Sequence, residues 1–68
     1  APISRARQVA AYVVREITNL PMKAIGVEFG GRDHSTIVYA IQKVETQMVQ
    51  DASFKHMVTD IIKNLSER

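Results

Sequence analysis

Residues 30–36 read Gly-Gly-Arg-Asp-His-Ser-Thr, and this stretch decides the fold because it sets a tight turn directly before a helical repeat. Two adjacent glycines can adopt left-handed backbone conformations that other residues disfavour. We expect one of the two to do so. Asp33 follows the glycines, where a short acidic side chain predicts the N-cap of a helix. The stretch therefore predicts a turn followed by an exposed helix start.

Outward from this turn, the spacing of apolar residues predicts an all-α fold. Four helices are expected, over about residues 4–18, 22–29, 34–48 and 53–66. Ser4 is the expected N-cap of the first helix, and Asp51 or Ser53 that of the last. Pro21 ends the first helix because proline and the residue before it both disfavour helical geometry. The predicted architecture is a small single-domain bundle over residues 1–68 that contains a TrpR-like helix-turn-helix.

The expected core consists of the apolar stripe on each helix, where such residues recur every three or four positions. The first stripe is Ala6, Val9, Ala10, Val13, Val14 and Ile17, with Tyr12 on another face. The second and third are Ile25 and Phe29, then Ile37, Ala40, Ile41, Val44 and Met48. The fourth is Phe54, Met57, Val58, Ile61, Ile62 and Leu65. Gly26 weakens its helix by roughly 1 kcal/mol relative to Ala, which predicts the close approach of another helix.

Composition excludes several classes of protein. The chain has 68 residues, 46% of them hydrophobic, and no cysteine. That content supports a small folded domain and rules out a disulfide scaffold and a thiolate zinc site. No apolar run approaches the roughly 18 residues that a membrane span needs, and no signal peptide is visible. Because the sequence begins with Ala rather than Met, we expect a fragment of a longer protein.

Charge is distributed unevenly along the chain. Residues 1–43 hold six Lys or Arg and three acids, whereas residues 44–68 hold three and four. The basic excess therefore lies in the half that contains the glycine turn. This is a mild polyanion signature.

Residues 25–44 resemble a known family. They read Ile-Gly-Val-Glu-Phe-Gly-Gly-Arg-Asp-His-Ser-Thr-Ile-Val-Tyr-Ala-Ile-Gln-Lys-Val. This run is similar to the signature of the C-terminal DNA-binding domain (domain IV) of the DnaA family of bacterial chromosomal replication initiators. Residues 5–10 and 15–19 resemble the preceding helix of that domain.

The resemblance implies binding to a nine-base-pair box in double-stranded DNA at the replication origin. The recognition helix would enter the major groove, while an arginine in a basic loop, near whose end this chain starts, would reach the minor groove. No Gly-x4-Gly-Lys-Ser/Thr motif occurs in the chain. No cofactor is therefore expected in this fragment, and ATP is expected on a separate domain of the parent protein. The parent is expected in the bacterial cytoplasm with the nucleoid, oligomerising on DNA through other domains, with regulatory proteins as possible partners.

The resemblance assigns base reading to the start of the third helix. Asp33 caps that helix, accepts a hydrogen bond from a cytosine amino group, or does both. His34 is expected to bond a base edge rather than a metal ion, since the chain has no cysteine and its other histidine, His56, lies in another predicted helix. Ser35 stands where the family usually has threonine, so it keeps the hydroxyl and lacks the methyl. Thr36 is expected to contact a phosphate or a base.

Phosphate contacts are expected from side chains in the basic half. The cations are Arg7, Arg15, Arg32 and Lys43, for which solvated surface charge is the alternative. Gln8, Thr18 and Asn19 match positions that contact the DNA backbone in the family. Lys23 stands where the family often has proline, and we expect it to meet a phosphate.

Other classes of function remain open at this point. A helix-turn-helix transcriptional regulator would share the same pattern. A helical protein-interaction module would use Tyr12 and Tyr39 as anchors. The stripe over residues 54–65 would suit a membrane or a partner helix, although core packing fits its mixed-charge opposite face better. An enzyme is not expected, because the chain lacks a paired-carboxylate, nucleophile–base or metal constellation.

Overall fold

The computed structural model describes residues 4–31 and 34–66, and these form four helices and no strand. The helices are α1 (Arg5–Ile17), α2 (Met22–Glu28), α3 (His34–Gln50) and α4 (Ala52–Ser66). The predicted all-α class is confirmed. Each boundary lies within two residues of its prediction, with the largest difference at the C-terminus of α3. The predicted cap residue Asp33 lies outside the described residues.

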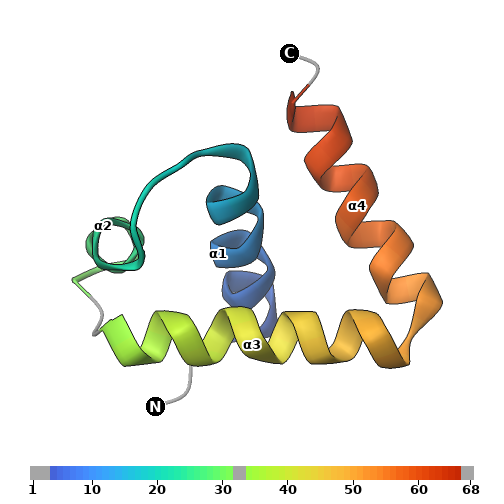
Figure 1. Cartoon of the computed structure of the whole chain (residues 1–68), viewed down its shortest axis with the longest axis horizontal. Coiled ribbons are helices and arrows are strands. Elements are labelled where there is room, and N and C mark those ends of the chain that lie inside the picture. The colour runs from blue at the N-terminus through green and yellow to red at the C-terminus, as the bar shows by residue number, and fades with distance from the viewer. Residues whose placement is uncertain (1–3, 32–33, 67–68) are drawn as a thin grey trace.

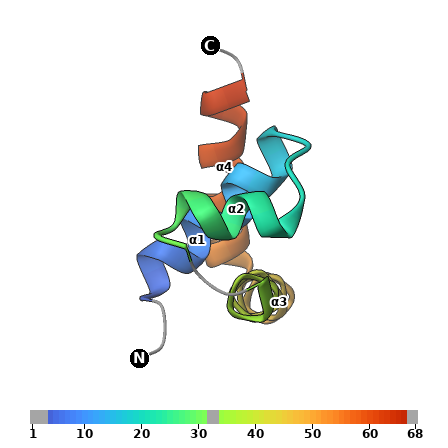
Figure 2. The ribbon, with the colours of Figure 1, turned by 90° about the vertical axis from the view of Figure 1, so that its left-hand side faces the viewer.

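Two of the four helices hold the bundle together. Both α1 and α3 pack against each of the other helices, whereas α2 and α4 do not contact each other in the described part of the chain. Figure 1 shows α3 lying across the molecule, with α2 over one end and α4 rising from the other. Viewed along α3, α1 lies beside it and the last turns of α4 extend beyond the other helices (Figure 2). The fold is therefore two three-helix groups that share α1 and α3.

The first group is the helix-turn-helix with α1 packed behind it. Its buried residues are Ala11, Ile25, Ile37 and Ile41, all at most 1% exposed. Met22, Val14 and Phe29 pack around them and are half-buried. Gly26 is buried within α2, as expected for a helix that lies close to its neighbours. Burial of each large aliphatic side chain contributes about 1.5–3 kcal/mol, so this cluster fixes α2 and α3 relative to α1.

The second group joins α4 to α1 and α3. Its buried residues are Val13, Val44, Phe54 and Val58, with Val9, Met48, Ile61 and Ile62 packed around them. Tyr12 packs against both clusters, so its predicted place on a face away from the core is wrong. It follows that one tyrosine links the two halves of the core.

The apolar stripe predicted for α1 is partly wrong. Ala11 is fully buried although it was not expected there, whereas Ala6 and Ile17 are exposed. The reason is that α1 packs against three helices, so its buried surface is wider than one stripe and turned toward α3. One apolar stripe with helical spacing predicts the buried residues of a helix that packs on one side only.

Part of the stripe predicted for α4 is also exposed. Met57 is 47% and Leu65 41% exposed, while Phe54 and Val58 are buried as expected. Met57 and Leu65 line two adjoining apolar hollows between α4 and α1, of about 410 and 330 Å³, that Ala6 also lines. The last turns of α4 extend past α1, so their apolar residues have fewer neighbours (Figure 1).

Two of the predicted helix caps lie within the described residues, those of α1 and α4. Ser4 accepts a hydrogen bond from the Arg7 amide through its hydroxyl, with an N–O distance of 3.4 Å, as predicted. Asp51 accepts one from the Phe54 amide at 3.1 Å, and α4 begins at the next residue. Of the two candidates for this second cap, Asp51 is therefore the cap and Ser53 lies inside the helix.

Both glycines of the turn, rather than one, have left-handed backbone conformations. Gly30 has φ of +88° and Gly31 of +71°. Their amides both donate to the Val27 carbonyl at 3.2 Å, which ends α2. Apart from the adjoining residues of the turn, no atom of the described part of the chain lies within 4 Å of where a Cβ would stand at either position. The requirement for glycine is therefore conformational rather than steric.

We predict that Gly30→Ala and Gly31→Ala each lower the free energy of unfolding by about 1–2 kcal/mol, the cost of a left-handed conformation for an L-residue. Gly31→Asn should lose less, since Asn tolerates that conformation better. Urea unfolding measures the difference. The exposed, non-capping Ser53→Ala is the control, with an expected change within about 0.5 kcal/mol. Stability unchanged in both glycine variants would contradict the prediction.

Candidate nucleic-acid interface

The core determines which side of α3 faces solvent. Ile37, Ala40, Ile41 and Val44 are at most 2% exposed and hold one side of the helix against α1 and α2 or α4. The other side is exposed at positions 34, 35, 39, 42 and 43. Because the buried residues span two turns, the helix has no freedom to present a different face. The predicted recognition helix therefore offers a fixed exposed stripe.

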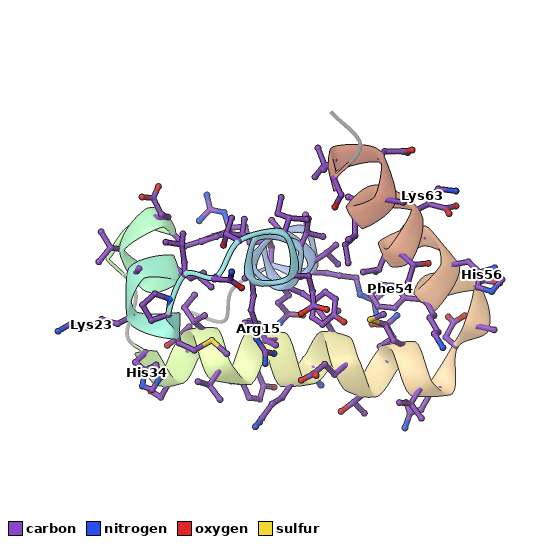
Figure 3. The ribbon with its side chains drawn as sticks, turned by 45° about the horizontal axis from the view of Figure 1, so that its top comes forward. Arg15, Lys23, His34, Phe54, His56 and Lys63 are labelled. Atoms are coloured by element: carbon purple, nitrogen blue, oxygen red, sulfur yellow. The ribbon has the colours of Figure 1, made fainter. Side chains whose placement is uncertain are left out.

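The start of α3 carries three of the predicted base-reading residues. His34 and Ser35 are exposed, whereas Thr36 is half-buried beside the core residue Ile37. Figure 3 shows His34 and Lys23 of α2 projecting at the same end of the molecule. Arg32 and Asp33 lie outside the described residues. The structure therefore leaves His34, Ser35 and Lys23 exposed, with His34 and Lys23 at one end of the molecule.

A polar groove of about 550 Å³ lies between α1 and α3, next to the exposed stripe of α3. Its lining residues are Arg5, Gln8, Lys43, Thr46, Gln47, Gln50 and Asp51. Gln8 and Lys43, which are 35 positions apart in the sequence, were both predicted to contact phosphate. Their presence in one groove shows that the first turns of α1 and the middle of α3 form one continuous surface.

Arg7 lies on the other side of the first turn of α1. It lines a separate hollow of about 330 Å³ with Glu28, Phe29 and Gly30, the end of α2 and the start of the turn. The helix-turn-helix is therefore bordered by a cation that comes from α1. No spacing of residues in the sequence predicts that Arg7 lies next to the end of α2.

Arg5 is tied to α3 and α4, which the sequence did not indicate. Its Nη2 donates to Oε1 of Gln47 at 2.6 Å. Its guanidinium carbon is 5.7 Å from the centre of the Phe54 ring, within the range of a cation–π interaction. These contacts join residues more than 40 positions apart, so only the helix packing reveals them. Arg5 therefore fixes the start of α1 against the other two helices.

At the other end of α1, Thr18 is part of the helix cap. Its hydroxyl donates to the Val14 carbonyl at 2.6 Å and accepts from the Leu20 amide at 3.4 Å. Thr18 is half-buried, while the neighbouring Arg15 and Asn19 are exposed. Through these two hydrogen bonds, Thr18 fixes the backbone at the end of α1, next to the exposed Asn19.

Tyr12 is unsuited to the partner-anchor role that was one alternative. Burial raises the pKa of its phenol, and the nearby carboxylates of Glu16 and Glu45 raise that pKa further. The phenol is therefore neutral at physiological pH, and its ring is part of the core. Tyr39, the other proposed anchor, is 53% exposed.

Within the described part of the chain, no three His, Cys, Asp or Glu side chains gather where a metal ion would bind. His34 and His56 lie at opposite ends of the molecule (Figure 3). None of the described helices combines the length and apolarity that crossing a bilayer requires.

Comparisons with known proteins point to one family. A family model described as the bacterial dnaA protein helix-turn-helix matches residues 1–44. Proteins named chromosomal replication initiator protein DnaA are similar to the chain: 49% identical over 59 residues in Geobacter sp. (strain M21), 48% over 59 in Citrifermentans bemidjiense and 41% over 64 in Thermodesulfovibrio yellowstonii. The alignments cover 87%, 87% and 94% of this chain but 13%, 13% and 15% of those proteins. No solved structure shows a significant match to the chain. The matches do not favour a transcriptional regulator or a protein-interaction module.

We predict an energetic coupling between Arg5 and Gln47. Each alanine variant should lower the free energy of unfolding, and the double variant should lose about 0.5 kcal/mol less than the sum of the two, because the pair shares one hydrogen bond. Urea unfolding of the four proteins gives the coupling. Arg7→Ala combined with Gln47→Ala is the matched control and should be additive, since Arg7 lies in a different hollow. Additive losses for Arg5 and Gln47 would refute the coupling.

Proposed function

The chain belongs to the bacterial DnaA helix-turn-helix family, and from that membership we propose that it binds double-stranded DNA with the start of α3 in the major groove. The observation that carries the proposal is the fixed exposed stripe of α3 with Gln8 and Lys43 in the groove beside it. An α-helix fits the major groove, and the first turn of a recognition helix meets base edges there. The exposed positions of His34 and Ser35 support a base-reading role for both.

The proposed phosphate contacts surround this stripe. Arg7 borders the turn, Gln8 and Lys43 share the polar groove, and Lys23 projects at the same end of the molecule as His34 (Figure 3). Three further proposed contacts, Arg15, Thr18 and Asn19, lie at the end of α1. Such contacts set the orientation of a protein on the duplex and supply affinity that depends on salt. Arg32, Asp33 and Thr36 complete the proposed set, with Asp33 accepting from a cytosine amino group.

The proposed target is the nine-base-pair box at a replication origin, because the similar proteins are named chromosomal replication initiators. In this proposal residues 1–68 act as one DNA-binding domain of a longer initiator. That initiator binds ATP and oligomerises through other domains, responds to regulatory proteins, and works at the nucleoid in the bacterial cytoplasm. The much greater length of the similar proteins supports the presence of further domains.

We predict that His34→Ala weakens binding to the box by about 1–3 kcal/mol and binding to a scrambled duplex much less, because a base contact is lost. Asp33→Ala should behave in the same way. Fluorescence anisotropy with both duplexes at one stated salt concentration measures this. His56→Ala, a histidine on α4 at the far end of the molecule, is the matched control and should bind as the unmodified chain does (Figure 3). Equal losses on both duplexes would remove His34 from base reading.

A second prediction concerns Arg7. Arg7→Ala should weaken binding to the box and to the scrambled duplex similarly, and the slope of log affinity against log salt should become shallower by about one. The reason is that one phosphate contact, and one released counterion, is lost. Lys63→Ala removes an exposed cation from the last turn of α4 and should leave the slope unchanged. An unchanged slope for Arg7→Ala would show that Arg7 does not contact phosphate.

A further inference from the structure

Tyr39 lies in the middle of the exposed stripe of α3. It follows Ser35 by four residues and precedes Lys43 by four, so the three side chains stand one above another on successive helical turns. Tyr39 is 53% exposed, although tyrosine has a large apolar ring that usually gains from burial. Neither the fold nor the proposed base and phosphate contacts account for this exposure.

The core prevents Tyr39 from turning away from this position. Its neighbour Ala40 is fully buried, and Ile37 and Ile41, on either side of the pair, are at most 1% exposed. The packing of these buried residues therefore fixes the backbone of α3 at position 39. If Ser35 and Lys43 both contact DNA, a side chain between them on the same stripe faces the same duplex.

Lys43 lies over the aromatic ring of Tyr39. Its ammonium nitrogen is 6.0 Å from the centre of the Tyr39 ring, at the limit of a cation–π interaction. Lys43 also lines the polar groove that contains Gln8. The Tyr39 ring is thus continuous with the proposed phosphate-binding surface. The pair presents a hydroxyl donor beside a positive charge, a combination suited to a phosphate group.

We propose that Tyr39 is a further DNA contact, whose phenol hydroxyl donates a hydrogen bond to a backbone phosphate at the edge of the groove that α3 enters. This inference rests on the proposed function. The surface around Tyr39 favours DNA over a protein partner, because the exposed neighbours on its stripe are polar or basic: Ser35, Gln42 and Lys43. A protein-binding anchor is typically set in an apolar, desolvated surrounding.

The test compares variants of the full chain in anisotropy titrations with the box and with a scrambled duplex, over a range of salt. Tyr39→Phe removes only the hydroxyl and keeps the ring over which Lys43 lies. We expect it to weaken binding to both duplexes about three- to tenfold, the effect of one hydrogen bond. The salt slope should not change, since no charge is lost. Lys43→Ala should weaken both and also make the slope shallower by about one.

Two controls separate a DNA contact from a structural effect. Tyr12→Phe makes the same chemical change at a core tyrosine, and Val49→Ala truncates an 87% exposed side chain near the end of α3. Both should bind DNA as the unmodified chain does, and thermal unfolding should show that Tyr39→Phe retains its stability. These results together would support the proposed contact.

Three results would overturn the proposal. Unchanged binding by Tyr39→Phe, with normal binding by the unmodified chain, would leave the proposed function intact and point to a protein partner for Tyr39. A loss confined to the box would indicate a base contact instead of a phosphate contact. A further variant, Tyr39→Ala, removes the ring as well. If it binds weakly and unfolds at a lower temperature while Tyr39→Phe binds normally, the ring acts only in packing. Failure of the unmodified chain to bind either duplex would instead reject the proposed function itself.

Discussion

The packing of α3 against α1 is the contact on which the rest of the structure depends. Ala11 of α1 and Ala40 of α3 are both fully buried, and such small side chains let helices approach closely. Ile37 and Ile41 lie in the same cluster as Ala11, while Val44 lies in the second cluster with Val13. Both halves of the core thus pass through these two helices. A change that moved α3 on α1 would displace α2, α4 and the exposed stripe together.

The sequence was sufficient to predict α3 but not α1, for a physical reason. All five residues predicted for the stripe of α3 are buried or half-buried, because its other side is left to solvent and the helical period is visible. In α1 the partners lie around several sides, so the buried Ala11 and the shared Tyr12 fall outside any single stripe. On α4 the period was correct, yet Met57 and Leu65 extend over open hollows that no pattern within one helix reveals.

The same distinction applies to the candidate interface. The exposure of His34 and Ser35 follows from local sequence. A glycine turn comes just before this helix, and the spacing of the apolar residues shows which side of the helix is buried. That Gln8 lies in a groove with Lys43, or that Arg5 bonds Gln47, depends on how the helices cross. Such contacts join positions 35 to 42 apart and carry no local signal. The left-handed conformation of both turn glycines shows a further limit, because composition marks a turn without giving the dihedral angles of each residue.

The structure also separates the side chains that hold the surface from those that present it. Arg5 and Thr18 engage protein atoms at the two ends of α1, and the exposed Arg7 and Asn19 follow them by two residues and one residue in the sequence. Arg7 and Asn19 are thus carried near residues that fix the local backbone. On α3 the buried Ile37 and Ala40 do the same for Ser35 and Tyr39. Side chains carried on a backbone that is already ordered lose less conformational entropy on binding, so more of each contact remains as affinity. This arrangement explains how a chain with a net charge of only +2 can offer a surface suited to DNA: the affinity would depend on where its few cations are held rather than on their number.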